Sequence, residues 1–303
     1  MLRFLIILLF FTISSLYAET KLGIGTIFTS TKSNFDTNSN NYLTKYDKPS
    51  SYKSDTALIG ELSFSKKYGD SSISGGIGYS GDARGLFISG KRKIENYGDL
   101  KAQIFIDPFK KGWKNPYKLN SKREETDIYT YGLNLELNKV MNTNFLIKYN
   151  LKYTDIRKDN VEYSTLKRDA IFKDFIVGYN VKTKIRGLMF IPEVSFNTSK
   201  AKGESNSFYG YGAGFSSLYF KRNLKLIFKG NIYKKYYQDD EPIFGKKRNE
   251  NSHNLMLVCN IDNPLGFEKT YLTLTAGYSE KYSNIDFYKE SKIFSGIIIG
   301  YKF

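Results

Sequence analysis

Long stretches of this chain alternate between apolar and polar residues, and this alternation constrains the fold more than any other feature. In DIYTYGLNLELNKV, residues 127–140, every second residue from Tyr129 to Leu137 is apolar and the residues between them are mostly polar. Side chains of a β-strand change sides at every residue, so a period of two indicates a strand with one apolar face. NFLIKYNLKYTD, residues 144–155, repeats the pattern, and the short KVMNT between the two segments predicts a β-hairpin.

The same period recurs along the chain and predicts an all-β fold of about 14 antiparallel strands, with 12 or 16 as the alternatives. The expected strands are 21–29, 56–66, 71–81, 84–94, 99–108, 127–138, 144–156, 170–183, 187–199, 206–220, 223–238, 252–261, 268–279 and 291–303. Most exceed the five to six residues typical of a soluble sandwich and suit the roughly 9–11 residues of a membrane-spanning strand. Pro192 lacks an N–H for the ladder and predicts a bulge or register shift.

The connections between these strands alternate in length. The short ones are KKYGD, ENYGD, KVMNT, KIRG, KRN and DNPLGF, and the long ones are 30–55, 109–126, 157–169, 200–205, 239–251 and 280–290. Short periplasmic turns and long extracellular loops are typical of outer-membrane barrels. The longest loop, 30–55, is interpreted either as an extracellular flap or as a segment that folds into the lumen.

The first 18 residues are expected to be a cleaved signal peptide. Arg3 precedes an apolar stretch over residues 4–13, and Ala18 is a suitable last leader residue. The stretch is shorter than the roughly 20 residues of a spanning helix, and no later run is long and apolar enough. A closed barrel is then the way left to satisfy the backbone in lipid. We therefore expect one domain, residues 19–303, forming a transmembrane barrel.

The last nine residues, SGIIIGYKF, place Ile297, Ile299, Tyr301 and Phe303 on one strand face. This ending resembles the C-terminal strand of Gram-negative outer-membrane barrels. The resemblance implies export to the outer membrane of a diderm bacterium and recognition of that strand by the barrel-assembly machinery. The whole chain from residue 19 is similar to a porin-type barrel. In addition, KLGIGTIFTSTKSNF at residues 21–35 and the hairpin at 127–155 resemble an uncharacterised bacterial barrel family labelled as a domain of unknown function, which implies no activity.

The polar rows opposite the apolar ones are expected to line the lumen. The residues singled out are Lys148, Lys152, Lys225, Lys229, Glu136 and Glu193. Because lysines outnumber glutamates, the hypothesis is a water-filled pore for small hydrophilic solutes with a weak preference for anions. In one alternative, these charges brace the wall, with Glu136 and Lys148 paired diagonally. In others, the lumen is plugged, carries hydrophobic substrates, or belongs to a non-conducting barrel that acts through its surface loops.

The formal charge of +16 is compatible with anionic partners, although a lysine-rich composition explains it equally well. Basic residues of the long loops would stand at the level of lipopolysaccharide phosphates, yet each by itself is predicted to be merely solvated. They are Lys110, Lys111, Lys114, Lys246, Lys247 and Arg248. The predicted export and the spread of charge over many loops argue against a nucleic-acid partner.

An enzyme is a minor alternative, in the form of an outer-membrane lipid-modifying protein. The single histidine, His253, adjoins Ser252, but neighbouring strand residues face opposite sides. Leu255 occupies the position where a serine could share the histidine's face, so no catalytic residues are assigned. One histidine and one cysteine, Cys259, provide no metal set, and we expect no cofactor. GGIGYSGDARG, residues 75–85, is glycine-rich, but no helix follows it to cradle a phosphate.

Overall fold

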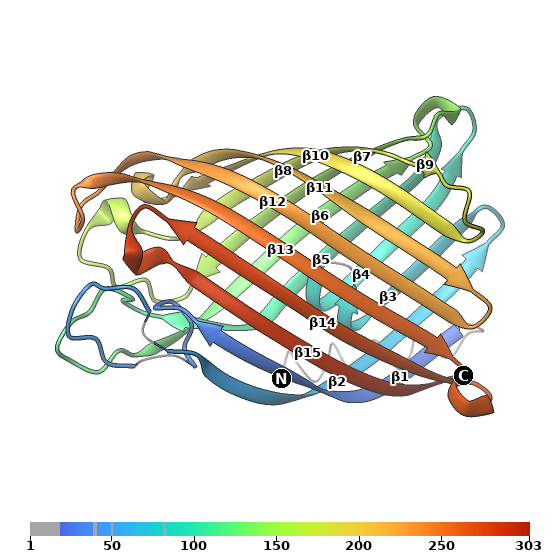
Figure 1. The fold of residues 1–303 in the computed structure, drawn as a ribbon, viewed down its shortest axis with the longest axis horizontal. Helices are drawn as coiled ribbons and strands as arrows, with labels where there is room; N and C mark the ends of the chain where they lie inside the picture. The colour runs from blue at the N-terminus through green and yellow to red at the C-terminus, as the bar shows by residue number, and fades with distance from the viewer. Residues whose placement is uncertain (1–18, 39–40, 50, 81–82) are drawn as a thin grey trace.

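The computed structural model describes residues 19–38, 41–49, 51–80 and 83–303, so the predicted signal peptide lies outside the described residues. The chain forms a closed barrel of long, tilted, antiparallel strands (Figure 1). The strands are β1 (Glu19–Lys32), β2 (Lys53–Tyr68), β3 (Ser71–Ser80), β4 (Ala83–Ile94), β5 (Gly98–Trp113), β6 (Glu125–Asn138), β7 (Phe145–Ile156), β8 (Ala170–Tyr179), β9 (Val181–Lys182), β10 (Leu188–Ala201), β11 (Phe208–Lys221), β12 (Leu224–Glu241), β13 (Lys246–Asp262), β14 (Thr270–Ser283) and β15 (Glu290–Lys302). Five single-turn 3₁₀ helices lie in the connections between the described strands: η1 (Val140–Asn142), η2 (Ser164–Leu166), η3 (Glu204–Asn206), η4 (Pro264–Gly266) and η5 (Asp286–Tyr288).

Apart from β8 and β9, which both pair with β10, each strand pairs with its neighbours in sequence, and β1 pairs with β15 to close the ring. That closing pair is continuous from Lys21 opposite Lys302 to Lys32 opposite Ser291. The two-residue β9 continues the path of β8 beside β10, so β8 and β9 together take one strand position in the barrel. The described residues therefore form a 14-stranded barrel, as predicted. None of the helices in the described residues is long and apolar enough to cross a membrane.

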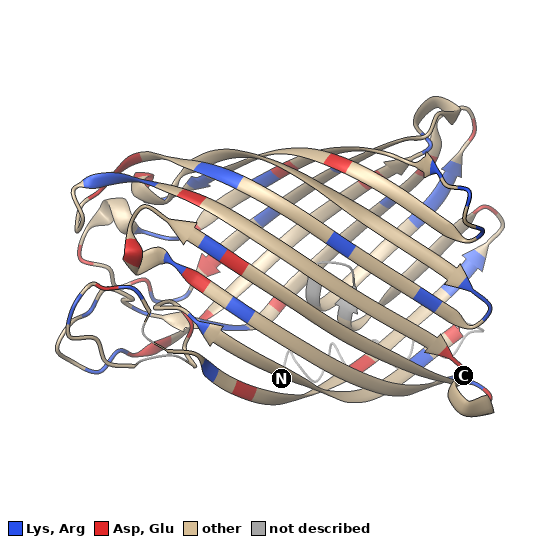
Figure 2. Cartoon of the chain, in the orientation of Figure 1, with Lys and Arg blue, Asp and Glu red and all other residues tan. Residues whose placement is uncertain are grey.

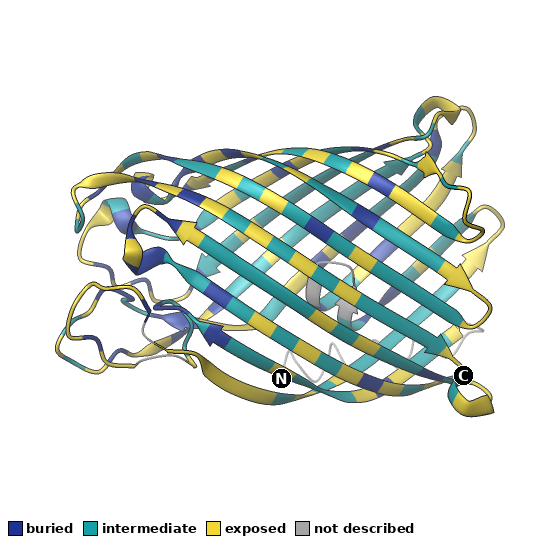
Figure 3. Ribbon diagram, in the orientation of Figure 1, coloured by how far each residue is buried: buried dark blue, intermediate teal, exposed yellow. Residues whose placement is uncertain are grey.

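The predicted alternation appears as alternating exposure along the strands (Figure 3). On the outer face, large apolar side chains are open to the surroundings, including Ile24 at 68% and Leu58 at 79% exposure. The row Ile297, Ile299, Tyr301 and Phe303 belongs to this outer face. An apolar exterior around a polar interior inverts the usual distribution of a soluble protein and is the pattern of barrels that stand in lipid.

The long and short connections gather at opposite ends, which we name the loop end and the short-turn end. Phe303 lies at the short-turn end, where its N–H donates to the carbonyl oxygen of Thr20 over 2.8 Å. Several strands extend further toward the loop end than the sequence pattern predicted. The expected loop 239–251 is mostly strand, because β12 and β13 continue as a hairpin that turns only at 242–245.

The predicted bulge or register shift at Pro192 is wrong. The pairing of β10 with β11 runs unbroken from Leu188 to Ser199. On its other side β10 keeps one register with β8 and β9, and only the pairs opposite residues 191–192 are missing. The proline, which lacks an N–H, thus interrupts the ladder between β8 and β9 without displacing it. The register shifts occur instead between Asp107 and Lys110, beside Pro108, and between Tyr236 and Asp240.

Candidate functional site

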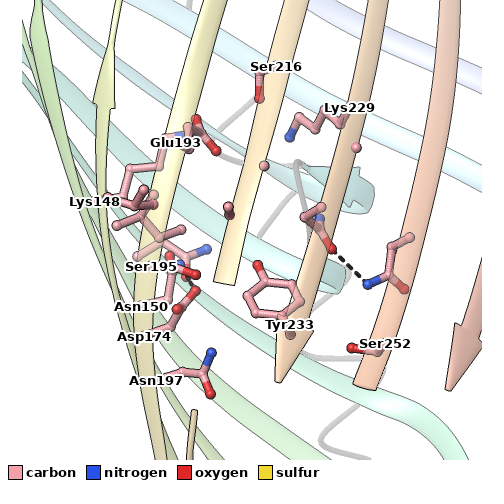
Figure 4. A pocket seen from close by; sticks show the side chains of 18 of the residues that line it. Lys148, Asn150, Asp174, Glu193, Ser195, Asn197, Ser216, Lys229, Tyr233 and Ser252 are labelled. Carbon is pink, nitrogen blue, oxygen red and sulfur yellow. Dashed lines mark hydrogen bonds and ion pairs between the residues drawn. The ribbon is translucent and has the colours of Figure 1, made fainter. Parts of the chain in front are cut away.

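A polar cavity of about 460 Å³ occupies the barrel lumen and is lined by residues from β5 round to β15 (Figure 4). Among the described residues, its charged lining consists of Lys101, Lys148, Lys152, Lys229, Lys235, Lys281, Glu136, Asp174, Glu193 and Glu290. Amides and hydroxyls fill the spaces between these charges, as in Asn150, Asn197, Ser216 and Ser252. The lining is therefore polar on most of its area and carries more cations than anions.

Five of the six residues singled out from the sequence line this cavity: Lys148, Lys152, Lys229, Glu136 and Glu193. The sixth, Lys225, lies nearer the short-turn end, one residue into β12, with its Nζ 5.5 Å from the centroid of the Phe220 ring.

Sequence reasoning missed several lining residues, of which Asp174 is the clearest case. In the segment IFKDFIVGY it shares the inner face of β8 with Phe172 and Ile176, so that face reads as apolar. Lys281 and Glu290 were missed because the sequence pattern predicted a loop over residues 280–290. In the structure both residues lie at the ends of strands, β14 and β15, whose alternation would have placed them on the inner face.

An ion pair crosses the inner wall between Lys148 and Glu193, with Nζ and Oε1 2.7 Å apart (Figure 4). The two side chains reach over β8, which lies between β7 and β10. Glu136, the partner expected for Lys148, lies directly opposite it in register but accepts a hydrogen bond from Asn138 at 2.5 Å. Wall bracing is therefore present between a lysine and a glutamate that the sequence had singled out, although the pair expected between Glu136 and Lys148 does not form.

Four lysines of the lining take no part in ion pairs within 4 Å among the described residues: Lys101, Lys152, Lys229 and Lys235. Lys235 lies 4.9 Å from the centroid of the Phe208 ring and Lys152 lies 6.0 Å from that of Phe172. Blue segments on the strands in Figure 2 show that basic residues occur along the barrel wall as well as in the loops. Uncompensated lysines in a lumen attract anions, because little water separates them from a passing ion.

Polar side chains in the same wall form a hydrogen-bonded chain that leaves some atoms available. Ser279 donates to Asn254, which donates to Asn231 over 2.7 Å. The buried Gln103 Nε2 and Asn197 Oδ1 have no hydrogen-bond partner among the described residues. A buried polar atom without a partner is unfavourable unless water or a solute satisfies it, so these atoms favour a hydrated cavity.

A second, smaller polar cavity of about 160 Å³ adjoins the lumen at the loop end. It shares Lys281 and Glu290 with the luminal cavity and is further lined by Lys32, Lys48, Tyr52, Glu280 and Lys289. Glu290 is held by the Ser33 hydroxyl at 2.8 Å and by Lys281 at 3.6 Å. We call this cavity the side entrance, because it shares lining residues with the luminal cavity and is also lined by the loop residue Lys48.

The rest of the loop end is covered by a cluster of apolar side chains from five separate loops, which we call the loop cap. Its members among the described residues are Phe35, Leu43, Tyr117, Leu119, Val161, Leu166, Ile243, Phe244, Ile285, Phe287 and Tyr288. The aromatic rings contact one another closely, as in the stacking of Phe35 on Tyr288 with centroids 5.2 Å apart. Loop 30–55 thus packs with the other long loops at the loop end, and none of its described residues lines the luminal cavity.

Buried polar groups bind the loops of the cap together. The guanidinium of Arg123, which is 2% exposed, donates to the carbonyl oxygens of Asn34 at 2.7 Å and Pro116 at 3.1 Å. It also lies 4.3 Å from the centroid of the Trp113 ring. Burial of this loop residue lowers the pKa of Arg123 to about 10, because the charged form loses hydration.

Arg248 is a second buried cation below the cap, and the prediction that it is merely solvated is wrong. Its guanidinium lies between the rings of Tyr237 and Tyr288, 3.7 Å and 3.9 Å from their centroids. Its Nε lies 3.5 Å from Glu250 Oε1, and both side chains are less than a tenth exposed. The Tyr288 hydroxyl contacts Tyr117 at 2.7 Å and donates to Glu241, which connects η5 to the neighbouring strands.

The residues considered for catalysis lie apart from one another. Ser252 lines the lumen, whereas His253 is exposed and packs edge-on against Tyr282 with ring centroids 5.9 Å apart. Cys259 is a free, half-buried cysteine. The described part of the chain contains no group of three or more histidine, cysteine or acidic residues able to hold a metal ion.

Comparisons with known proteins identify a family. The model of a family described as "protein of unknown function (DUF2860)" matches residues 18–302, which confirms the predicted resemblance to a family of unknown function. No curated protein matches the chain.

Among solved structures, the COG4313 outer membrane channel from Pseudomonas putida F1 is 10% identical, with a TM-score of 0.45 and 96% and 97% of the two chains covered. OprD from Pseudomonas aeruginosa is 7% identical, with a TM-score of 0.42 and 95% of each chain covered. OpdQ from the same organism is 8% identical, with a TM-score of 0.40 and 95% and 99% covered.

Proposed function

We propose that this chain, which belongs to the DUF2860 family, forms a channel in a bacterial outer membrane that passes small hydrophilic solutes and prefers anions. The observation that carries the proposal is the polar luminal cavity, in which six lysines face four carboxylates among the described lining residues. The side entrance continues this lining toward the outside with Lys32, Lys48 and Lys289. A solute would pass around the loop cap rather than through it.

The membrane location is supported by the outer face of the barrel. Exposed apolar side chains follow the strands on this face, among them Ile24, Leu58 and Ile299. Burying such a surface in lipid is favourable, and closure of the sheet leaves most backbone groups paired. Export by the leader peptide, recognition of the row ending at Phe303 by the assembly machinery, and contact of loop lysines with lipopolysaccharide are parts of the same proposal.

The anion preference is assigned to the lysines without acidic partners. Lys148 is neutralised by Glu193 at 2.7 Å and Lys281 lies 3.6 Å from Glu290, so these two contribute little net charge. Lys152 and Lys229 line the cavity without such partners and are the strongest candidates (Figure 4 shows Lys229). Charged rings that line a pore select ions of opposite sign.

The test is single-channel recording of the refolded chain in a planar bilayer with a salt gradient. The double substitution Lys152→Glu and Lys229→Glu should move the reversal potential from anion toward cation preference. Lys184→Glu is the matched control, because Lys184 is exposed in a turn at the short-turn end and makes the same change of charge outside the lumen. The control should leave the reversal potential where it was.

Two outcomes would contradict the proposal. A folded barrel that never conducts would refute the channel and favour a surface protein that acts through its loops. Conduction with a reversal potential that the double substitution leaves unchanged would refute the assignment of selectivity to Lys152 and Lys229.

A further inference from the structure

The barrel wall has an opening where the β3–β4 hairpin is too short to fill the space between β2 and β5. β2 pairs with β3 only over residues 62–68, whereas β2 itself continues to Lys53 at the loop end. β5 pairs with β4 only up to Ile106, whereas β5 continues to Trp113. Among the described residues, β2 from 53 to 61 and β5 from 108 to 113 therefore have no paired strand on their facing edges.

Glycines in the segment GGIGYSGDARG explain why the hairpin ends early. Gly78 and Gly85 pair with each other across it, and their φ angles of +143° and +111° are ones that other residues rarely adopt. A side chain at residue 85 would meet the carbonyl oxygen of Ile106 at 2.3 Å. This close approach and the two unusual φ angles require glycine at the point where pairing with β2 and β5 ends.

A cavity of about 380 Å³ occupies the opening and is lined by residues from both faces of β2. Leu58 and Leu62 come from the outer face of β2, while Ile59 and Glu61 come from its inner face. A hollow on one side of an intact sheet is lined by one face, because strand side chains alternate. Lining by both faces therefore means that the cavity runs around the free edge of β2. We call this opening the lateral window.

The lateral window has a closed frame. Above it, the loop after β1 meets the loop after β5: residue 42 forms a β-bridge with residue 122, and the Asn120 N–H donates to the Leu43 carbonyl oxygen over 2.7 Å. Below it are Gly78 and Gly85, and at its rim is Phe109, which is 55% exposed. The seven paired residues of β2 place the lower edge roughly 15 Å from the short-turn end, inside the lipid layer.

The chemistry of the lateral window is apolar. Its lining also includes Leu22, Ile77 and Gly60. Among the described lining residues the one charged group is Glu61, which accepts a hydrogen bond from Tyr271 at 3.3 Å.

The inner wall beside the lateral window is apolar as well, in contrast to the lysine-rich wall across the lumen. Ile59, Gly25 and Ile298 form one row across β2, β1 and β15, and Ala57, Ile27 and Gly296 form the next. The lumen thus has an apolar surface that leads to the opening.

We propose that the lateral window is a route by which small, uncharged apolar molecules pass between the lumen and the lipid layer. The volume suits such a ligand, since small-molecule sites measure about 300–1,000 Å³. Apart from Glu61, the described lining gives it apolar contact and continues the lipid-facing surface at Leu22 and Leu58. The inference shares the membrane location with the proposed function, but it concerns a different path and a different class of solute.

The test blocks the lateral window with a side chain that the fold can accept. A Cβ added at Gly60 meets no atom within 4 Å, so Gly60→Trp should fill the opening without disturbing the strands. Gly90→Trp is the matched control, because Gly90 is equally open and exposed but lies in β4 away from the opening. The probe is 1-N-phenylnaphthylamine, an uncharged aromatic that fluoresces in lipid, added to cells whose outer membrane excludes it unless the full chain is expressed.

Expression of the unaltered chain and of Gly90→Trp should raise probe uptake, and Gly60→Trp should return it to the level of cells without the protein. All three chains should show the same ionic conductance in a planar bilayer, which separates failure of this route from failure of the channel. Equal uptake by the two tryptophan variants, or no uptake above that of cells without the protein, would overturn the proposal and leave the lateral window as a gap filled by lipid alone.

Discussion

Substitution of Arg248 by methionine should loosen the loop cap. The change removes a guanidinium that packs between Tyr237 and Tyr288 and lies 3.5 Å from Glu250. Glu250 is 4% exposed and would keep its charge without its arginine. Removing one member of a buried ion pair costs about 3–5 kcal/mol. We expect about 3 kcal/mol, because the Tyr237 hydroxyl still donates to Glu250 over 2.9 Å.

A loss of this size raises local opening of the cap roughly 100-fold. Amide hydrogen exchange followed by mass spectrometry should show it as lost protection over residues 114–124 and 284–289, with the barrel strands unchanged. The double variant Arg248→Met with Glu250→Gln should recover most of the protection, because no charge is then left unpaired. Arg186→Met, in an exposed turn at the short-turn end, is the control. Unchanged protection in Arg248→Met, or a double variant as open as the single one, would refute the reasoning.

Two further predictions concern a turn and a loop. Gly98→Ala should destabilise the barrel by about 2 kcal/mol or more, because Gly98 has a φ of +119° and an added Cβ would lie 2.2 Å from the carbonyl oxygen of Asn138. Gly69→Ala, with a φ of +55° and no atom near the added Cβ, should cost only about 1 kcal/mol. Urea unfolding in detergent measures the free energy of unfolding of both variants. Equal losses of this free energy in the two variants would contradict the prediction. Lys114 holds the pKa of the Glu124 carboxyl below its usual value of 4.5, so the stability from this pair is present above that value and is lost as the pH falls through the lowered pKa. The protection factors of residues 114–124, which compare measured amide exchange with the intrinsic rate at the same pH, should therefore fall below pH 4.5 in the unaltered chain but not in Glu124→Gln.

Much of the barrel was predictable from the sequence because strand periodicity is a local property. Each run shows which residues share a face, so the placement of Lys152 and Lys229 on an inner wall followed from their neighbours alone. The exposed row from Ile297 to Phe303 followed in the same way. The strand ends were less accurate where charged residues break the alternation outside the membrane-facing part, as in the β12–β13 hairpin.

The contacts that close the lumen depend on where the strands end and how the ring closes. The loop cap joins Phe35, Tyr117, Leu166, Phe244 and Phe287, which come from five loops that only barrel closure brings together.

The lateral window depends on how far each strand pairs with its neighbour, which no single strand's pattern contains. Lys148 likewise pairs with a residue two strands away instead of with the hairpin partner suggested by the sequence. The sequence by itself determined which face of each strand is polar, because that follows from successive residues. Only the tertiary structure decided which polar and apolar groups meet, because those contacts join residues far apart along the chain.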